Sequence, residues 1–306
     1  MEFIIQTNNL VKCYKEHEVV SLVNMNVRKG SIYGLLGRNG AGKTTIMNMI
    51  LGLTNATSGE ISVMGKSLKN NKQEIYSRVG VMLDTLSFYP NLTATENLQV
   101  FAKLRGTISR NAIRDALEIA GLPFHDKKRF SEFSLGMKQR MGFANAIMHD
   151  PELLILDEPS NGLDPVGIVE MRKYIKMLSE ERGKTILVSS HILSEIALIA
   201  DDIGILHKGK LLEECSYAEL QSKNRQYTLL QISSATSASR ILEQQFHITD
   251  YIVEDEHTIR LFDISHSTAE LNKVLLENGV SVMGLQPCSE SLEDYFKKLT
   301  GGADID

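Results

Sequence analysis

The sequence predicts an α/β fold built around a parallel sheet, followed by a smaller α+β domain. Short apolar runs bounded by glycine, proline or polar residues indicate four buried strands, at residues 31–37, 78–83, 153–156 and 185–190. Strands that are apolar on both faces are typical of a parallel sheet covered by helices. Helical patterns follow several of these runs, and a new alternation of short strands and helices begins near Tyr227.

Composition narrows the class of protein. The chain has 306 residues, 42% hydrophobic and 23% charged, which suffices for one large domain or for a medium and a small one. A net charge of −5 without a long Lys/Arg run argues against a nucleic-acid partner. The three cysteines (Cys13, Cys215 and Cys288) lie far apart and form no CxxC pattern, so neither a disulfide framework nor a zinc site is expected.

The sequence carries no clear membrane or export signal. The opening residues, MEFIIQTNN, lack the basic and the long apolar regions of a signal peptide, and we expect none. No apolar run approaches the roughly 18 residues that a membrane-spanning helix needs. We therefore expect any work at a membrane to depend on a partner.

Two helices of the first part are predicted from periodicity and a cap. Over residues 43–53, apolar side chains share one face at Ile46, Ile50 and Leu53. Farther along, Thr93 and Glu96 have the spacing of a capping box, so a helix begins there.

A third helix is predicted over residues 134–150, and it stops before Pro151. Its apolar stripe consists of Met137, Met141, Ala144 and Met148. This stripe indicates core packing rather than a ligand site. Residues 204–214 predict a hairpin with its turn at Lys208–Gly209, and residues 3–33 alternate enough to indicate further strands.

The C-terminal part has the pattern strand, helix, strand, strand, helix, strand. This order is that of a ferredoxin-like domain, with one more helix expected over residues 291–299. The polar residues 221–226 are a candidate linker. We therefore expect one domain over residues 1–222 and an accessory domain over residues 223–306, whose role the residues leave open.

The stretch GLLGRNGAGKTT fits the phosphate-loop pattern G-x-x-x-x-G-K-[ST] at Gly37, Gly42, Lys43 and Thr44. Glycines let the backbone wrap a phosphate with several N–H groups pointing inward, and the following helix adds its positive end. Lys43 supplies a cation for the β- and γ-phosphates, and the Thr44 hydroxyl can hold Mg²⁺. The loop sits between a predicted strand and a predicted helix, which is the context that the motif requires.

Acidic residues end the buried strand LLIL, at Asp157 and Glu158. Asp157 could hold Mg²⁺ from the second side, and Glu158 could polarise a water for attack on the γ-phosphorus. By itself such a pair is usually a solvated turn, but a phosphate loop in the same chain favours the catalytic interpretation. His191 ends the next strand, where it is either structural or close enough to reach the γ-phosphate.

A second anion site is suggested by SEFSLGMKQRMGF, residues 131–143. Ser134 and Gly136 stand at a predicted helix start, and Lys138 and Arg140 follow in its first turns. The residues alone leave open whether this site serves the nucleotide of its own chain or that of another.

Together these motifs resemble the ABC transporter ATPases over about residues 3–220. GRNGAGKTT corresponds to Walker A, LLILDEP to Walker B, SNGLDP (160–165) to the D-loop, and SSH ends in the switch histidine. The resemblance implies a P-loop NTPase of ABC type, with an antiparallel β subdomain and a helical signature subdomain at about residues 85–150. Tyr14 matches the aromatic residue that stacks on adenine in this family, although a lone tyrosine could also be ordinary strand packing.

The resemblance also implies the ligands. ATP and Mg²⁺ are the expected cofactors, with Thr44, Asp84 and Asp157 on the metal and Glu158 and His191 catalytic. The expected nucleotide contacts are Tyr14, Gly37, Arg38, Asn39, Gly40, Ala41, Gly42, Lys43, Thr44, Thr45, Ser134 and Gly136.

Two positions depart from the family pattern. The signature Leu-Ser-Gly-Gly-Gln is here Phe-Ser-Leu-Gly-Met, which keeps Ser134 and Gly136 but loses the glutamine. The usual glutamine after the strand at 78–83 is here Asp84, which is either a metal-linked carboxylate or plain loop.

Within the family, the chain resembles subunits that protect bacteria from peptide antibiotics such as bacitracin and lantibiotics. This implies a homodimer or paired ATPase in which each signature helix caps the other copy's nucleotide. It also implies permease subunits on a separate chain, at the cytoplasmic face of the membrane. The alternatives are export of another substrate, a non-transport ABC ATPase, or an ordinary P-loop kinase, in which SLGMKQR and SNGLDP would have no purpose.

Overall fold

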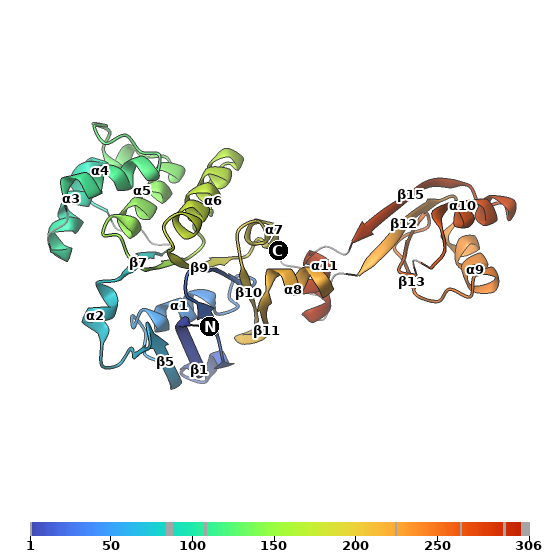
Figure 1. The fold of residues 1–306 in the computed structure, drawn as a ribbon, viewed down its shortest axis with the longest axis horizontal. Helices are drawn as coiled ribbons and strands as arrows, with labels where there is room; N and C mark the ends of the chain where they lie inside the picture. The colour runs from blue at the N-terminus through green and yellow to red at the C-terminus, as the bar shows by residue number, and fades with distance from the viewer. Residues whose placement is uncertain are drawn as a thin grey trace. The chain divides into compact units, whose positions relative to one another are not determined.

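The computed structural model describes residues 2–83, 88–106, 109–223, 225–263, 265–289 and 292–300. The chain divides into two compact units, the first extending to Ala218 and the second beginning at Glu219 (Figure 1). Each unit has its own hydrophobic core.

A six-stranded sheet forms the centre of the first unit, in the order β11-β10-β4-β9-β8-β7. Its strands are β4 (Ile32–Leu36), β7 (Val79–Met82), β8 (Leu153–Leu156), β9 (Thr185–Ser190), β10 (Asp202–His207) and β11 (Lys210–Ser216). All neighbours are parallel except β10 and β11. The four strands predicted from apolar runs are confirmed, and β4, β8 and β9 are buried along their whole length.

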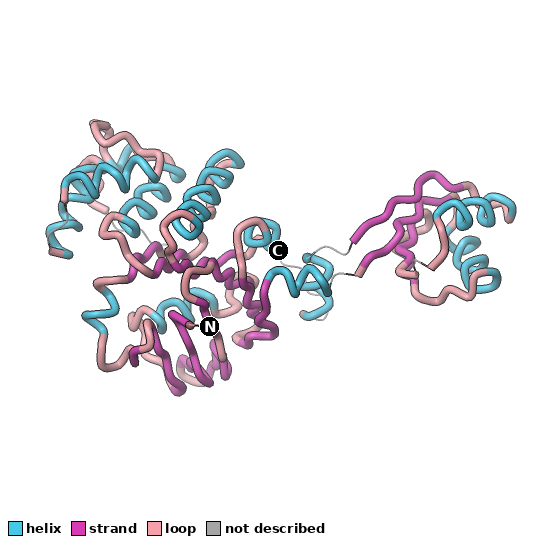
Figure 2. The backbone as a smooth tube through the Cα atoms, viewed as in Figure 1, coloured by secondary structure: helices cyan, strands magenta, loops and turns pink. Residues whose placement is uncertain are grey.

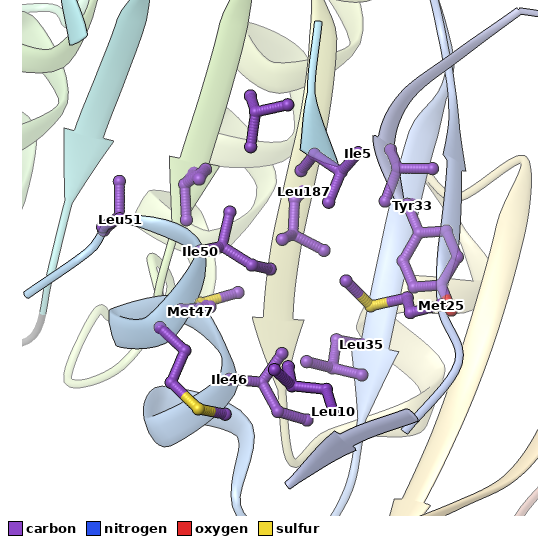
Figure 3. Close-up of a cluster of buried hydrophobic side chains, with 14 of the residues drawn as sticks. Ile5, Leu10, Met25, Tyr33, Leu35, Ile46, Met47, Ile50, Leu51 and Leu187 are labelled. Atoms are coloured by element: carbon purple, nitrogen blue, oxygen red, sulfur yellow. The ribbon is translucent and has the colours of Figure 1, made fainter. Parts of the chain in front are cut away.

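The N-terminal part of the chain forms a second sheet, which is antiparallel. Its strands are β1 (Phe3–Tyr14), β2 (His17–Val23), β3 (Asn26–Arg28), β5 (Ser58–Val63) and β6 (Lys66–Ser67). Helix α1 (Lys43–Ile50) follows β4, and its buried side chains meet those of β1 and β4 in one core (Figure 3).

The predicted face of α1 is correct for Ile46 and Ile50, which are fully buried. It is wrong for Leu53, which is 65% exposed. The helix ends at Ile50, and Gly52 takes a left-handed backbone with φ 61°, so the helical periodicity does not reach Leu53.

The remaining helices of the first unit are α2 (Lys72–Tyr76), α3 (Ala94–Arg105), α4 (Arg110–Ile119), α5 (Leu135–Ile147), α6 (Pro165–Glu180) and α7 (Leu193–Ala197). The capping box of α3 is confirmed, since Thr93 accepts from the Glu96 amide and Glu96 accepts from the Thr93 amide. Helix α5 begins at its cap Ser134 and packs against β7. Met141, Ala144 and Met148 of the predicted stripe are buried as expected of core packing, whereas Met137 is only half-buried.

The predicted hairpin is also confirmed. Strands β10 and β11 join through Lys208 and Gly209, with φ of 46° and 78°. Two successive positive φ values are typical of the tight turns that match the twist of paired strands.

The second unit contains β12 (Gln226–Ile232), α9 (Ala235–Gln245), β13 (Tyr251–Val253), β14 (Thr258–Leu261), α10 (Thr268–Glu277), β15 (Val282–Ser289) and α11 (Leu292–Leu299). Its sheet runs β13-β14-β12-β15 with every neighbour antiparallel, which is the predicted ferredoxin-like arrangement. Figure 2 colours the strands and helices of this unit by type. Helices α9 and α10 cover one face and share a core with β12 and β14. Part of the expected linker is helical, because α8 (Tyr217–Lys223) includes residues 221–223.

Candidate functional site

The loop between β4 and α1 has the backbone of a phosphate cradle. Gly40 and Gly42 have φ of 80° and 109°, values that favour glycine. A Cβ on Gly37 would lie 2.5 Å from the carbonyl oxygen of Leu206, so only glycine lets the loop pass this close to β10. The loop then leads into α1 at Lys43.

Lys43 is 5% exposed and its ammonium is held at the loop. Its Nζ donates to the carbonyl oxygens of Gly37 at 2.5 Å and Arg38 at 3.3 Å. The same Nζ lies 3.1 Å from Oε1 of Glu158. The lysine thus joins the phosphate-loop backbone to the acidic end of β8.

Asp157, 2% exposed, is fixed by hydroxyl groups on both carboxylate oxygens. The Thr44 hydroxyl donates to Oδ2 at 2.7 Å, and the Ser189 hydroxyl donates to Oδ1 at 2.5 Å. The backbone N–H of Glu158 in turn donates to Ser189 Oγ at 2.9 Å.

Glu158 has a left-handed backbone, with φ 48°, a conformation that an L residue rarely adopts. Its Oε2 lies 2.8 Å from Nδ1 of His191. Its Oε1 is buried and makes no hydrogen bond to any described residue, so the contact with Lys43 is a charge pair without hydrogen-bond alignment. A buried carboxylate oxygen of this kind can accept a hydrogen bond from a water.

These side chains meet because they stand at the same ends of neighbouring parallel strands. Strand β9 pairs with β4 on one side and β8 on the other. The phosphate loop follows β4, Asp157 and Glu158 follow β8, and His191 follows β9. Ligands of open α/β sheets bind at such carboxyl ends.

The charge around the loop suits a polyanion. At the end of β10, burial lowers the pKa of His207, and the charges of Lys208 and Arg38 act in the same direction. The side chains of Lys208 and Arg38 thus place positive charge near the end of β10.

The donor set fits a magnesium ion. Thr44 and Asp157 present a hydroxyl and a carboxylate oxygen to each other, and Mg²⁺ prefers oxygen ligands. Within the described ranges, no group of three or more His, Cys, Asp or Glu could hold a metal by itself. An ion here would therefore take its other ligands from phosphates and water, as Mg²⁺ commonly does.

The second predicted anion site has a different environment. Ser134 is exposed and caps α5, where its Oγ accepts from the Met137 amide at 3.3 Å. A Cβ on Gly136 would lie 3.3 Å from a methyl group of Leu163, in the SNGLDP turn. These contacts are made within the helix and to that turn, so the geometry of one chain does not join Ser134 to the loop 37–45.

Tyr14 ends β1 and is 48% exposed. The Lys12 ammonium lies 4.6 Å from the centre of its ring and also donates to the Asn55 carbonyl at 2.8 Å. An exposed ring fixed in this way can stack on a planar base. Asp84, the other predicted metal residue, lies outside the described residues.

Sequence reasoning missed Ser189. It is completely buried and bonds both acidic residues at the end of β8. The sequence did contain a signal for it, because the largely apolar strand TILVSS ends in two serines.

Comparisons with known proteins agree with this geometry. Residues 20–161 match a family model described as ABC transporter. The chain is 52% identical over 100% of its length to the Enterococcus faecalis "Bacitracin transport ATP-binding protein BcrA", and covers 99% of it. It is 42% identical to the Streptococcus pyogenes "Lantibiotic transport ATP-binding protein SrtF", over 70% of the chain and 91% of that relative. Among solved structures, a dimeric ATP-binding cassette in a post-hydrolysis state with ADP and Pi matches at 25% identity and TM-score 0.64, covering 70% of this chain and 98% of the other.

Proposed function

The chain belongs to the ATP-binding proteins of ABC transporters, and on that premise we propose that it hydrolyses ATP to drive the removal of bacitracin by a membrane permease on a separate chain. The proposed substrate rests on the full-length match to a bacitracin transport ATP-binding protein at 52% identity. The side chains described above serve the nucleotide, so the substrate is assigned from this match alone.

The lantibiotics are the second candidate substrate, because a lantibiotic transport protein is 42% identical. That match covers 70% of this chain and 91% of the relative, so the relative has little length left to match the second unit. The bacitracin relative spans both units. Of these two substrates, the match over the second unit therefore favours bacitracin.

Each part of the site has a proposed task in the reaction. The loop 37–45 and Lys43 bind the phosphates, and Thr44 with Asp157 would hold Mg²⁺, which supplies charge neutralisation to the triphosphate. Glu158 orients and polarises a water through its carboxylate. His191, bonded to Glu158 Oε2, fixes the direction of that carboxylate and lies at the same strand ends as the phosphate loop.

Two copies are proposed to complete the site. Ser134 is exposed at the start of α5 and its contacts are local, so it is free to meet a phosphate held by a second copy. The helix N-terminus adds its positive dipole. A related cassette is dimeric with ADP and Pi bound, which supports this arrangement.

Work at the membrane is proposed to depend on the permease. None of the described helices is both long and apolar enough to cross a bilayer. We place the protein at the cytoplasmic face, held there by its partner.

Antibiotic susceptibility tests this function. The chain is expressed with its own permease in a sensitive bacterium, and the inhibitory concentration of bacitracin is compared for wild type and Lys43→Ala. Wild type is expected to raise that concentration several-fold and Lys43→Ala to leave it at the empty-vector level. Protection against a lantibiotic but not against bacitracin would reassign the substrate. Equal protection by Lys43→Ala would show that resistance does not depend on ATP binding at the phosphate loop.

A further inference from the structure

We propose that Ser189 is a positioning residue for the ATPase reaction, fixing with one hydroxyl the carboxylate of Asp157 and the backbone of Glu158. This inference rests on the proposed ATPase function of the site. Its basis is a pair of short hydrogen bonds: Ser189 Oγ donates to Asp157 Oδ1 at 2.5 Å and accepts from the Glu158 N–H at 2.9 Å.

The first contact orients the carboxylate that faces Thr44. Asp157 has one oxygen toward Ser189 and the other toward the Thr44 hydroxyl. Because Ser189 holds Oδ1 from the side of β9, Oδ2 stays directed at Thr44, where a cation would have to be bound. A carboxylate anchored through one oxygen keeps the other in a fixed direction for a ligand.

The second contact supports the strained residue. Glu158 has φ 48°, and such a backbone persists only when its surroundings hold it. Its N–H would lack a partner without Ser189, since the bond to Ser189 Oγ is the contact that satisfies it. The direction of the Glu158 side chain, toward Lys43 and His191, therefore depends on the same hydroxyl.

Loss of these hydrogen bonds should have a large effect because the residues that make them are buried. Ser189 is 0% exposed and Asp157 is 2% exposed, so no bulk water is available to replace the lost bonds. Partners that orient a metal ligand typically contribute 10- to 100-fold to metal affinity or activity. We expect an effect in roughly this range.

The test compares Ser189→Ala with Thr185→Ala in the purified full-length chain. Thr185 lies on the same strand, is 1% exposed, and its hydroxyl accepts from the Gly30 N–H at 2.8 Å. Both variants remove a buried hydroxyl of β9 that accepts a hydrogen bond from a backbone N–H outside this strand. Only Ser189 touches Asp157 and Glu158, so Thr185→Ala controls for structural loss.

Four quantities are measured: kcat, the Mg²⁺ dependence of ATP binding, ATP binding in EDTA, and hydrogen exchange of the Glu158 amide. Ser189→Ala is expected to lower kcat about tenfold or more and to raise the Mg²⁺ concentration for half-maximal ATP binding by a similar factor. ATP binding in EDTA should stay within about twofold of wild type, because the loop 37–45 is untouched. Hydrogen exchange of the Glu158 amide, followed without nucleotide, should speed up in Ser189→Ala and remain unchanged in Thr185→Ala.

The outcomes separate this inference from the proposed function. If wild type turns over ATP and Ser189→Ala behaves like Thr185→Ala in kcat, in Mg²⁺ dependence and in hydrogen exchange, Ser189 is not a positioning residue. If wild type itself neither binds nor hydrolyses ATP, the proposed function fails first.

Discussion

The ammonium of Lys43 and the carboxylate of Glu158 lie 3.1 Å apart, with side chains 5% and 14% exposed. One residue begins α1 and the other follows β8, so the pair links the phosphate loop directly to the acidic strand end. Because both groups are removed from water, each depends on the other for charge compensation.

The first prediction concerns this pair. Lys43→Ala leaves a buried carboxylate without its cation, which typically costs about 3–5 kcal/mol. In a domain of this size that lowers the melting temperature by roughly 6–20 °C. Adding Glu158→Gln to the variant removes the uncompensated charge and should restore part of the loss. Calorimetry of the four proteins in the cycle measures the coupling, and strictly additive shifts would show that the contact carries no energy.

Glu158 is predicted to be the general base. Glu158→Gln keeps the shape of the side chain but cannot accept the proton from the attacking water, so turnover should fall by about 10²–10⁴-fold. ATP binding should persist, and the variant should accumulate as an ATP-bound dimer that gel filtration detects. Turnover close to that of wild type would show that another group activates the water.

Tyr14 is predicted to stack on adenine. Stacking of a base on an aromatic ring contributes about 1–3 kcal/mol, so Tyr14→Ala should weaken ATP binding by roughly 5- to 150-fold. Tyr14→Phe keeps the ring and should bind within a few-fold of wild type. Titration with a fluorescent ATP analogue measures both, and equal affinity for the alanine and phenylalanine variants would assign Tyr14 to strand packing.

Protonation of His149 is expected to make the stability of the fold depend on pH. Burial lowers its pKa below the ordinary 6.5, and the charge of Arg105 acts in the same direction; its Nε2 lies 3.2 Å from the Val79 carbonyl. The unfolded chain therefore binds the proton more tightly than the folded one, and this contribution to stability is complete above about pH 6.5 and lost as the pH falls below it.

Thermal unfolding from about pH 7.5 to about pH 5.5 measures this slope. His149→Gln can still donate to the Val79 carbonyl but cannot titrate, so its melting temperature should fall less over the same interval. A variant that retains the full slope would place the effect on other groups.

Local patterns predicted much of the fold. Strands β4, β8 and β9 follow from apolar runs alone, and the order of elements in the second unit was sufficient for its ferredoxin-like sheet. The error at Leu53 has a local cause, because periodicity does not show where Gly52 ends the helix. The helical residues 221–223 are polar, and polarity alone does not distinguish a linker from an exposed helix turn.

The contacts of the site were harder to predict, because they depend on the order of strands in the sheet. Strand β9 lies between β4 and β8 although it comes last of the three in the chain. That order brings Ser189 to Asp157 and His191 to Glu158. A sequence motif indicates which chemistry is present, but not which hydroxyl reaches which carboxylate.

The most direct test of the shared nucleotide site combines two inactive variants. Lys43→Ala disables the phosphate loop. Gly136→Asp places a negative charge near the start of α5, which the helix dipole tolerates but a phosphate repels. Each purified variant alone should be inactive.

If the site is formed between two copies, a mixed dimer holds one intact site. An equal mixture should then regain about a quarter of wild-type ATP turnover, because half of the dimers are mixed and each has one working site of two. If each chain used its own Ser134 and Gly136, every site in the mixture would remain defective, and a mixture as inactive as its components would contradict the account.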